Sequence, residues 1–262
     1  VYINEARRAG ATICLPCVNR SLWATTIYGT SLYLGFDSLL HFEVKQADRL
    51  VEERRQHGEY RGLADFQQRT AIGLEQLLLL IRVGAFRTFN VSKKALLWEA
   101  HLLLSKHRPA QETGRLFECS TRKPVLPALE DDPLEDYYDE IELIGFVVSG
   151  TLFDLARSSF RGDSTTEQLL PHVGKTIRMV GDFVAEKPVK TKRGEMMKFG
   201  TFLDHQGLFF DTVHFPPSLR NFPLRGAGIY LLEGKVVNEF GCPSLEVIRC
   251  AKMPLRGDPR SE

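Results

Sequence analysis

The pattern of hydrophobic and polar positions changes along the chain, from helical spacing in the first hundred residues to alternation after residue 174. Residues 43–58, EVKQADRLVEERRQHG, place apolar side chains three and four residues apart, at Val44, Ala47, Leu50 and Val51. This spacing predicts an amphipathic helix with its charges on the opposite face. Gly58 then stands where a C-terminal cap belongs. Residues 1 to about 105 are expected to be helical.

Two more segments of this part have the same character. Residues 72–86, IGLEQLLLLIRVGAF, form an apolar helix pattern that ends at Gly84. Residues 91–107, VSKKALLWEAHLLLSKH, begin with Ser92 in the N-cap position and continue to Lys106. The first part of the chain is therefore expected to consist of short helices joined by tight turns.

A linker and an acidic stretch follow. Four prolines fall between residues 107 and 133, a composition typical of a linker. Residues 130–142, EDDPLEDYYDEIE, hold eight acids and no base, which leaves the rest of the chain with nine more bases than acids. The carboxylates could suggest a two-metal site, but their position beside a linker favours a solvated face, and a short helix should lead to a turn at Gly150.

The last third of the chain predicts strands. Five segments alternate β-branched or aromatic residues with polar ones and lie at 175–186, 197–206, 208–215, 228–240 and 244–253. A gap of about a dozen residues separates the third from the fourth, as in a small OB barrel. A five-stranded SH3-like barrel is the alternative. The predicted fold class is α+β in two parts, a helical module followed by a five-stranded OB-type β-barrel.

Positive charge in the barrel segment gathers in one loop. Residues 171–255 contain twelve bases and eight acids, and residues 187–198 alone contain five bases against one acid. The bases are Lys187, Lys190, Lys192, Arg193 and Lys198, which could contact phosphates. The nearby Phe199 and Phe202 are candidates for stacking on bases. The alternative is that the phenylalanines are core and the lysines a solvated hairpin; of the adjacent Phe209 and Phe210, at most one can point inward.

Composition and motifs exclude several other classes. With 43% hydrophobic and 26% charged residues the chain can fill a core. It has no segment long and apolar enough to cross a bilayer and no secretory signal. Five scattered cysteines, including the CLPC at residues 14–17, favour free thiols in a reducing cytoplasm over disulfides or zinc. No phosphate-binding loop, nucleophile elbow or metal-binding helix is present, so we expect no catalytic residue and no metal site.

The order of the motifs resembles the C-terminal region of the bacterial DNA polymerase III alpha subunit, the C-family replicative DNA polymerase. The resemblance covers about residues 1–255 and is carried by PCVNRS at 16–21, the segment 34–66, LIRVGAF at 80–86, LIGFVVSGTLFDL at 143–155 and the strands. It implies five parts: the tail of the fingers region at 1–33, a tandem helix-hairpin-helix module at 34–106, a linker at 107–169, an OB domain at 170–256 and a tail at 257–262.

The resemblance also implies partners and roles. The helical module would grip duplex DNA through backbone amides, the OB domain would bind single-stranded template, and Asn19 and Ser21 would belong to a P-x-V-N-x-S element near DNA. The parent protein would be a nucleotidyltransferase that uses Mg²⁺. Its palm and catalytic aspartates would lie upstream, so this chain is expected to be a cofactor-free fragment.

The chain departs from the family at its first hairpin. Where the family has a G-V-G turn, this sequence has His41, Phe42 and Glu43. Losing both glycines removes easy access to positive φ and places a carboxylate where an anion should dock. Lys45 and Arg49 could compensate, or the module could serve only as scaffold. The second hairpin keeps its VGAF at Val83–Phe86.

A second departure lies in the linker. Family members often carry a sliding-clamp peptide of the type Q-x-x-L-F, and this chain has TGRLF, with Leu116 and Phe117 as apolar anchors but Thr113 in place of the glutamine. Two hypotheses remain open: a DNA-binding region that performs no chemistry itself, or a replisome scaffold that binds the clamp and other subunits and contacts DNA incidentally.

Overall fold

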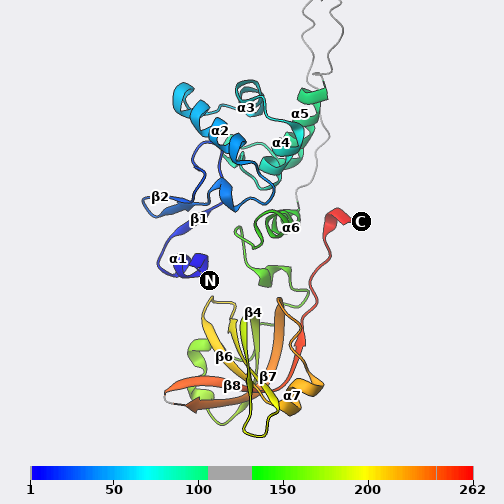
Figure 1. The fold of residues 1–262 in the computed structure, drawn as a ribbon. Coiled ribbons are helices and arrows are strands. Elements are labelled where there is room, and N and C mark those ends of the chain that lie inside the picture. The colour runs from blue at the N-terminus through cyan, green and yellow to red at the C-terminus, as the bar shows by residue number, and fades with distance from the viewer. Residues whose placement is uncertain (1, 106–131, 240, 262) are drawn as a thin grey trace, which may run out of the picture. The chain divides into compact units, whose positions relative to one another are not determined.

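The computed structural model of the chain describes residues 2–105, 132–239 and 241–261. The chain divides into two compact units (Figure 1). The helical unit comprises residues 9–149 and 258–262, and the barrel unit comprises residues 1–8 and 150–257. The acidic stretch therefore belongs to the helical unit, and residues 150–169 belong to the barrel unit. Among the described helices, none has the length and apolar character needed to span a membrane.

The helical unit contains the helices predicted at residues 43–58, 72–86 and 91–107, the short helix expected at the acidic stretch, and a further helix that no pattern predicted. They are α2 (Val44–His57), α3 (Leu63–Thr70), α4 (Leu74–Arg82), α5 (Lys93–Ser105) and α6 (Pro133–Ile144), with the 3-10 turns η1 (Phe36–Ser38), η2 (Arg87–Phe89) and η6 (Pro259–Ser261). Gly58 follows α2 with φ of 81°, which confirms the predicted C-cap. The Ser92 Oγ accepts a hydrogen bond from the Ala95 amide at 3.2 Å, which confirms the predicted N-cap of α5.

The prediction that residues 1–105 are helical throughout is wrong for residues 12–33. Three short strands, β1 (Thr12–Cys14), β2 (Thr26–Tyr28) and β3 (Ser31–Tyr33), form a sheet in the order β1-β3-β2. β1 is parallel to β3, and β2 pairs with β3 as a hairpin around Gly29, whose φ is 61°. Strands of three residues are too short to show alternation, so the periodicity could not reveal them.

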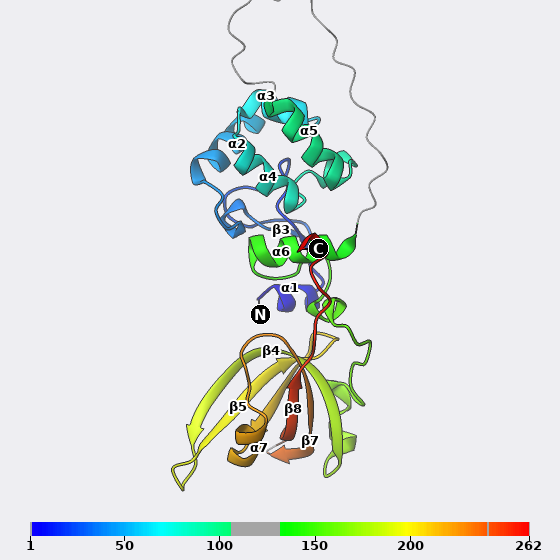
Figure 2. The same ribbon diagram turned by 90° about the vertical axis from the view of Figure 1, so that its right-hand side faces the viewer.

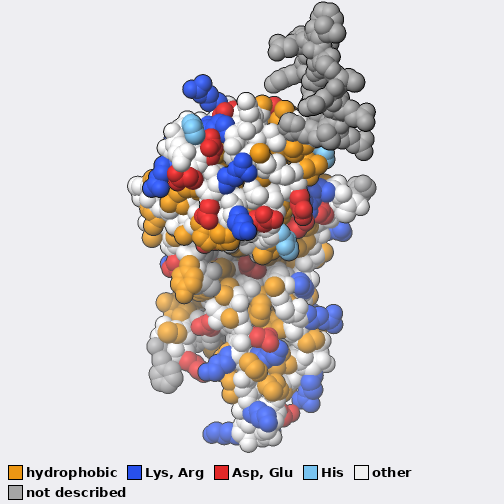
Figure 3. Space-filling model, turned by 45° about the horizontal axis from the view of Figure 1, so that its top comes forward, with side chains coloured by type: hydrophobic (Ala, Val, Ile, Leu, Met, Phe, Trp, Pro, Cys, Tyr) orange, Lys and Arg blue, Asp and Glu red, His pale blue; other side chains and the backbone are white. Residues whose placement is uncertain are grey.

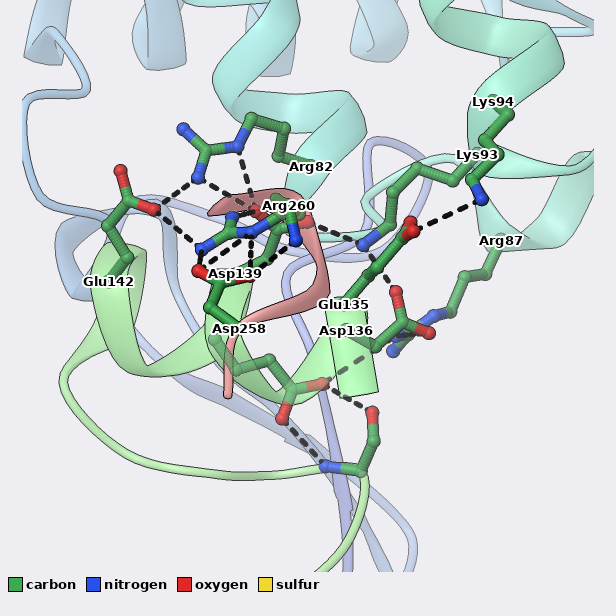
Figure 4. A network of polar contacts seen from close by, with 12 residues as sticks. Arg82, Arg87, Lys93, Lys94, Glu135, Asp136, Asp139, Glu142, Asp258 and Arg260 are labelled. Atoms are coloured by element: carbon green, nitrogen blue, oxygen red, sulfur yellow. Dashed lines mark hydrogen bonds and ion pairs between the residues drawn. The ribbon is translucent and has the colours of Figure 1, made fainter. Parts of the chain in front are cut away.

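The acidic stretch forms α6, and the prediction of a solvated face is wrong for its central carboxylates. Asp132 caps the helix through a bond from the Leu134 amide to its Oδ1 at 2.9 Å. The side chain of Asp139 is 3% exposed and that of Glu140 is 1% exposed. Asp139 accepts from Arg82 Nε at 2.8 Å and Lys93 Nζ at 2.7 Å (Figure 4).

The partners of α6 come from both flanks of the second hairpin. Arg260 of η6 also donates to Asp139. Around this centre, Figure 4 shows further ion pairs, Arg82–Glu142, Lys93–Asp136, Lys94–Glu135 at 3.1 Å and Arg87–Asp136 at 3.7 Å. α6 thus neutralises the cations at the end of α4, in η2 and at the start of α5.

The barrel unit confirms the second part of the predicted fold. Its strands are β4 (Thr176–Lys190), β5 (Met196–Leu203), β6 (Phe209–His214), β7 (Ile229–Glu239) and β8 (Cys242–Lys252). They close in the order β4-β5-β6-β8-β7, with β6 and β8 parallel and every other pair antiparallel (Figure 2). α7 (Pro216–Asn221) connects β6 to β7, and α1 (Tyr2–Arg8) and the turns η3 (Leu152–Leu155), η4 (Thr166–Gln168) and η5 (Leu170–His172) complete the unit. This is the OB arrangement.

An aromatic cluster fills the barrel. Phe202 and Phe210 stack with ring centroids 5.7 Å apart, and Tyr230 meets Phe202 edge-on at 5.9 Å. Gly181 of β4 lies directly beneath these rings, where an added Cβ would come within 2.8 Å of Phe202 Cβ. Only glycine allows the strand to approach the rings this closely.

The buried network on α6 predicts an unequal response to two isosteric substitutions. Asp139→Asn removes the charge but leaves three cations around a nearly inaccessible site, so it should lower the free energy of unfolding by about 3 kcal/mol. Glu142→Gln changes a side chain that is 53% exposed and should cost less than about 1 kcal/mol. Chemical denaturation measures the free energy of unfolding of both variants. Equal losses of stability would show that the burial of Asp139 does not determine how much it stabilises the protein.

A half-buried carboxyl of the barrel predicts a pH-dependent effect. Burial raises the pKa of Asp182 on β4 from 3.8 to about 6. Its contribution to stability is complete below pH 3.8 and is lost as the pH rises through 6, where the ionised form is disfavoured. Asp182→Asn should therefore stabilise the barrel at pH 7, by about 2 kcal/mol, and have little effect at pH 4.

Asp204 provides the contrasting control. Its 2% exposed carboxylate accepts hydrogen bonds from the amides of Gln206, Leu208 and Thr166 at 2.9–3.0 Å. Asp204→Asn should destabilise the barrel at pH 7. Thermal unfolding at pH 4 and 7 measures Tm for both variants. If both asparagine variants shifted Tm in the same direction at pH 7, the stabilising effect predicted for Asp182→Asn would be contradicted.

Candidate nucleic-acid interface

The outer face of the barrel carries an exposed aromatic ring between an amine and an apolar side chain. Strand register places Lys187 of β4 opposite Phe199 of β5, and Phe199 opposite Val213 of β6. Directly opposed residues project from the same face of a sheet. Phe199 is 43% exposed. A flat apolar ring is thus available to solvent beside a cation, the combination that suits stacking on a base.

The β4–β5 hairpin carries the cations that the sequence predicts. Lys187, Lys190, Lys192 and Arg193 are exposed, and in the described ranges none of their side chains takes part in an ion pair. Lys198 differs, because its Nζ donates to Glu186 at 2.6 Å. Gly194, with φ of 79°, forms the turn and brings both arms of the hairpin together. Figure 3 shows Lys and Arg side chains beside apolar ones on the barrel unit.

Phe202 is not available for stacking, and its assignment to DNA binding is wrong. Its exposed fraction is 0%, and its ring belongs to the aromatic core. Phe199 and Phe202 are three residues apart, so they project from opposite faces of a strand whose side chains alternate. The same alternation buries Phe210 and leaves Phe209 partly exposed, as predicted for that adjacent pair.

Two polar side chains near Phe199, Asp211 and His214, add no positive charge to this face. Asp211 is exposed on β6 and accepts from Thr201 Oγ1 at 2.8 Å, so a carboxylate borders the row of Phe199. On the inner side, burial lowers the pKa of His214 from 6.5 to about 4. His214 is therefore neutral at pH 7 and adds no positive charge to the interface.

The element at residues 16–21 has a structural role in the helical unit. Asn19 Nδ2 donates to the Tyr60 carbonyl at 2.9 Å, while the Tyr60 amide donates to Asn19 Oδ1 at 2.8 Å. Ser21 is 0% exposed; its hydroxyl donates to the Leu34 carbonyl and accepts from the Cys17 amide. The assignment of Ser21 to DNA binding is wrong, because the hydroxyl is buried and fully used. Asn19 is occupied in tying the chain to the α2–α3 loop.

The first hairpin keeps a glycine-like backbone without glycine. His41 has a φ of 65°, in the left-handed region. Gln76 of α4 holds this turn: its Nε2 donates to the His41 carbonyl at 3.0 Å, and its Oε1 accepts from the Glu43 amide at 2.9 Å. The Leu40 amide donates to the Leu143 carbonyl of α6 at 2.8 Å. These two amides are therefore not available to a phosphate.

The second hairpin shows the same internal use of its amides. Gly84 has a φ of 77°, and its amide donates to the Ile81 carbonyl at 2.9 Å. The amides of Val83 and Ala85 donate to Leu79 and Leu80. The VGAF element thus caps α4. Side chains remain as possible DNA contacts, and Lys45 and Arg49 are exposed one turn apart on α2, with no ion pair recorded for either in the ranges described.

The remaining predictions concern a clamp-binding peptide, the cysteines and metal ligands. The clamp-peptide candidates Thr113, Leu116 and Phe117 lie outside the described residues. Four cysteines, Cys14, Cys17, Cys242 and Cys250, are free thiols. Within the described ranges, no three His, Cys, Asp or Glu residues gather in a way that could hold a metal ion.

Sequence reasoning missed the residues around α7. Phe215 and Phe222 flank this helix and are 41% and 38% exposed, and Arg220 projects from it. The segment FPPSLRNFPLR interleaves aromatic, basic and proline residues, and this composition could have identified it as a second aromatic and cationic surface.

The strained turn at His41 makes a prediction. A side chain at positive φ costs about 1 kcal/mol that glycine does not incur, so His41→Gly should raise the free energy of unfolding by up to about 1 kcal/mol. His57→Gly, at an exposed position of α2, should lower it by a similar amount. Urea denaturation distinguishes the two; a loss of stability in His41→Gly would mean that the imidazole itself stabilises the turn.

Comparisons with known proteins agree with this architecture. The family model described as a helix-hairpin-helix motif matches residues 10–96. The chain is 28% identical to DNA polymerase III subunit alpha of Staphylococcus aureus over 241 residues, which is 89% of this chain and 22% of that protein. It is 26% identical to the same subunit of Staphylococcus epidermidis over 243 residues, with the same shares. The chain spans about a fifth of the length of these curated relatives.

Solved structures show a weaker likeness. A deletion mutant of the single-stranded DNA binding protein from Thermus aquaticus matches 33% of this chain and 44% of its own, with a TM-score of 0.30 and 16% identity. The second OB-fold domain of replication protein A from Methanococcus maripaludis matches 31% and 84%, with a TM-score of 0.22 and 15% identity. Both scores lie below 0.5, so neither likeness bears on function.

The relatives, the matched motif and the order of the two units all support the same resemblance. Similarity to the polymerase subunit extends over nearly the whole chain, and the helix-hairpin-helix match falls on the helical unit. The resemblance predicted from the motifs is thereby confirmed: nearly the whole chain is similar to a part of DNA polymerase III subunit alpha, consistent with a C-terminal region.

Proposed function

We propose that this chain is the DNA-binding C-terminal region of a replicative DNA polymerase and that its barrel unit binds the single-stranded template. DNA synthesis would be the activity of the longer parent chain, with Mg²⁺ at a catalytic centre outside this region. The observation that carries the proposal is the hairpin of four exposed cations without ion-pair partners in the described ranges, next to the exposed ring of Phe199.

Physical chemistry assigns different tasks to the two kinds of side chain. The amines and the guanidinium attract phosphates whatever the base sequence and release counterions on binding. The ring of Phe199 offers a surface to any base, because every base has a π-face. Together they suit a single strand whose sequence changes continuously, which is what a replicative polymerase must hold.

The helical unit would contact duplex DNA through side chains. Lys45 and Arg49 are exposed on α2, whereas several amides of both hairpins bond within the protein. The cations around the second hairpin are also engaged, because α6 pairs with them. We therefore expect the barrel to supply more of the affinity than the helical unit.

A scaffold that binds the sliding clamp and other replisome subunits is the second candidate. The observation that favours it is the internal use of amides in both hairpins, which leaves these turns poorly suited to grip phosphate. Apolar docking into a clamp pocket should change little with salt, whereas DNA binding should weaken steeply. Salt dependence therefore separates the two candidates.

The hairpin cations generate a prediction with a charge-matched control. Lys190→Ala combined with Lys192→Ala should weaken binding to single-stranded DNA and lower the slope of log K against log salt by about 1.4, that is, by about 0.7 for each lost phosphate contact. Lys175→Ala with Lys235→Ala removes two exposed charges at the opposite end of β4 and should leave the slope unchanged. Fluorescence anisotropy between about 50 and 200 mM salt measures both.

The outcome separates the proposal from its alternative. If both double variants reduced the slope equally, the barrel would bind DNA through its overall charge and not through the hairpin. If the unaltered chain bound neither single-stranded nor duplex DNA, while a clamp bound it with little dependence on salt, the scaffold would be the function that remains.

A further inference from the structure

A groove lies between the β4–β5 hairpin and α7. Its volume is about 290 Å³, and its walls are apolar, formed by Met196, Pro216, Leu219, Pro223 and Leu224. Three charged side chains, Glu195, Lys198 and Arg220, stand among the lining residues. Figures 1 and 2 both show α7 at the end of the barrel where the β4–β5 hairpin projects. The groove is thus continuous with the basic hairpin.

The groove exists because β5 extends past the barrel core. Met196 projects from the same side of β5 as the buried Phe202, since six residues separate them in a strand of period two. Phe202 is 0% exposed, yet Met196 is 47% exposed. By residue 196 the inward side of the strand no longer faces the core but faces α7. About half of the Met196 side chain therefore remains exposed in the groove, where it can contact a ligand.

The far wall is rigid before any ligand arrives. Pro216 and Pro217 fix the start of α7, and Pro223 follows its end. The Phe222 amide donates to the Ser218 carbonyl at 2.7 Å, and the Phe222 carbonyl accepts from Cys250 Sγ at 3.4 Å. Leu224 is 8% exposed and belongs to the barrel core. A wall held in this way loses little conformational entropy when a ligand binds.

The size and the walls fit one flat ring system. The volume lies at the lower limit of small-molecule sites. Met196 and the proline rings present apolar surfaces, while one side of the groove is open to water. A nucleobase has an apolar face and polar edges, so its face could lie against these walls while its edges stay hydrated.

The charge around the groove fits a polyanion. Residues 187–225 contain seven bases and three acids. Arg220 pairs with Glu195 at 3.5 Å, but their side chains are 68% and 47% exposed. An exposed pair of this kind contributes little, so the guanidinium can exchange the carboxylate for a phosphate at small cost. An acidic or phosphorylated backbone is therefore favoured over a neutral apolar peptide.

We propose that the groove between the β4–β5 hairpin and α7 binds an unstacked nucleobase of single-stranded DNA, with Met196 against the ring and Arg220 on the adjoining phosphate. The base lies beyond Phe199, on the α7 side of the hairpin, so the bound strand passes from the outer face of β5 to α7. This assignment rests on the proposed binding of single-stranded DNA and adds a base-binding position to it.

An abasic strand separates contacts to bases from contacts to phosphates. We would measure the affinity of the whole chain for an oligothymidylate and for an abasic oligonucleotide of the same length. The unaltered chain should prefer the base-bearing strand roughly 5- to 100-fold, the range expected for stacked bases. Met196→Ala should lower affinity for the oligothymidylate about 5-fold or more and leave affinity for the abasic strand unchanged.

Two further variants complete the test. Arg220→Ala should weaken binding to both strands by the same factor, because it removes a phosphate contact. Leu170→Ala truncates an aliphatic side chain that is 53% exposed, at the other end of β4, and should change neither affinity. A Met196→Ala variant that bound both strands as the unaltered chain does would overturn the groove assignment.

The remaining outcomes distinguish the base-binding position from the proposed binding of single-stranded DNA. If the unaltered chain bound both strands equally tightly, the base position would be wrong, while phosphate-driven binding by the hairpin would stand. If it bound neither strand, the proposed function itself would fail. If an apolar peptide bound in the groove and DNA did not displace it, the base assignment would also be overturned, and the groove would be a protein-docking site.

Discussion

The pairing of α6 with the cations of the second hairpin determines where this chain can meet a polyanion. A formal net charge of +1 suggests little affinity for one. The charge, however, is distributed unevenly. Eight acids lie in one stretch, and their helix neutralises Arg82, Lys93 and Lys94 within the helical unit. Four cations of the barrel hairpin, at residues 187, 190, 192 and 193, have no ion-pair partner among the described residues, so positive potential remains there.

The same ion pairs allow α6 to hold together elements that are distant in the sequence. Asp139 binds cations from α4, α5 and the C-terminal turn, which are distant in sequence. Glu140 accepts from the amides of Val148 and Ser149 at 2.6 and 2.9 Å, and its Oε1 lies 3.6 Å from Arg87 Nη2. One helix therefore fixes the second hairpin, the C-terminal turn and the segment that leaves toward the barrel unit. Removing either charge would weaken the hydrogen bonds of several donors that lie on different elements.

Both hairpins keep their backbone turns while several of their amides bond within the protein. The first keeps its left-handed residue although a histidine occupies the position, because Gln76 supplies both a donor and an acceptor to the turn. The second keeps its glycine but uses the neighbouring amides to cap α4. In each case backbone geometry survives because the surrounding packing needs it. Under the proposed function, contact of the helical unit with DNA would therefore depend on side chains, such as the exposed Lys45 and Arg49 on α2.

The sequence predicted the regular elements well and the environment of single residues less well. Helical spacing identified α2, α4 and α5, and alternation identified all five barrel strands, because both periods follow from backbone geometry. The three-residue strands at 12–33 were missed because no period shows over so few positions. Ser21 and Phe202 were assigned to DNA, but burial depends on which strand or turn lies opposite, which composition does not reveal. The acidic stretch looked solvated for the same reason, since its cationic partners are far away in the chain.

Alternation in β5 also explains why the candidate interface has two parts. Phe199 projects outward from the barrel, whereas Met196 projects from the other side of the same strand. Phe199 is exposed because it lies on the outer side of the strand, and Met196 is exposed because the core ends between Phe202 and Met196. A ligand that used both side chains would have to pass around the edge of the sheet at the hairpin. A flexible, unstacked single strand can make that turn, while a stiff duplex cannot. In the proposed interface, the geometry of one strand would thus favour single-stranded over duplex DNA at the barrel, independently of its charge.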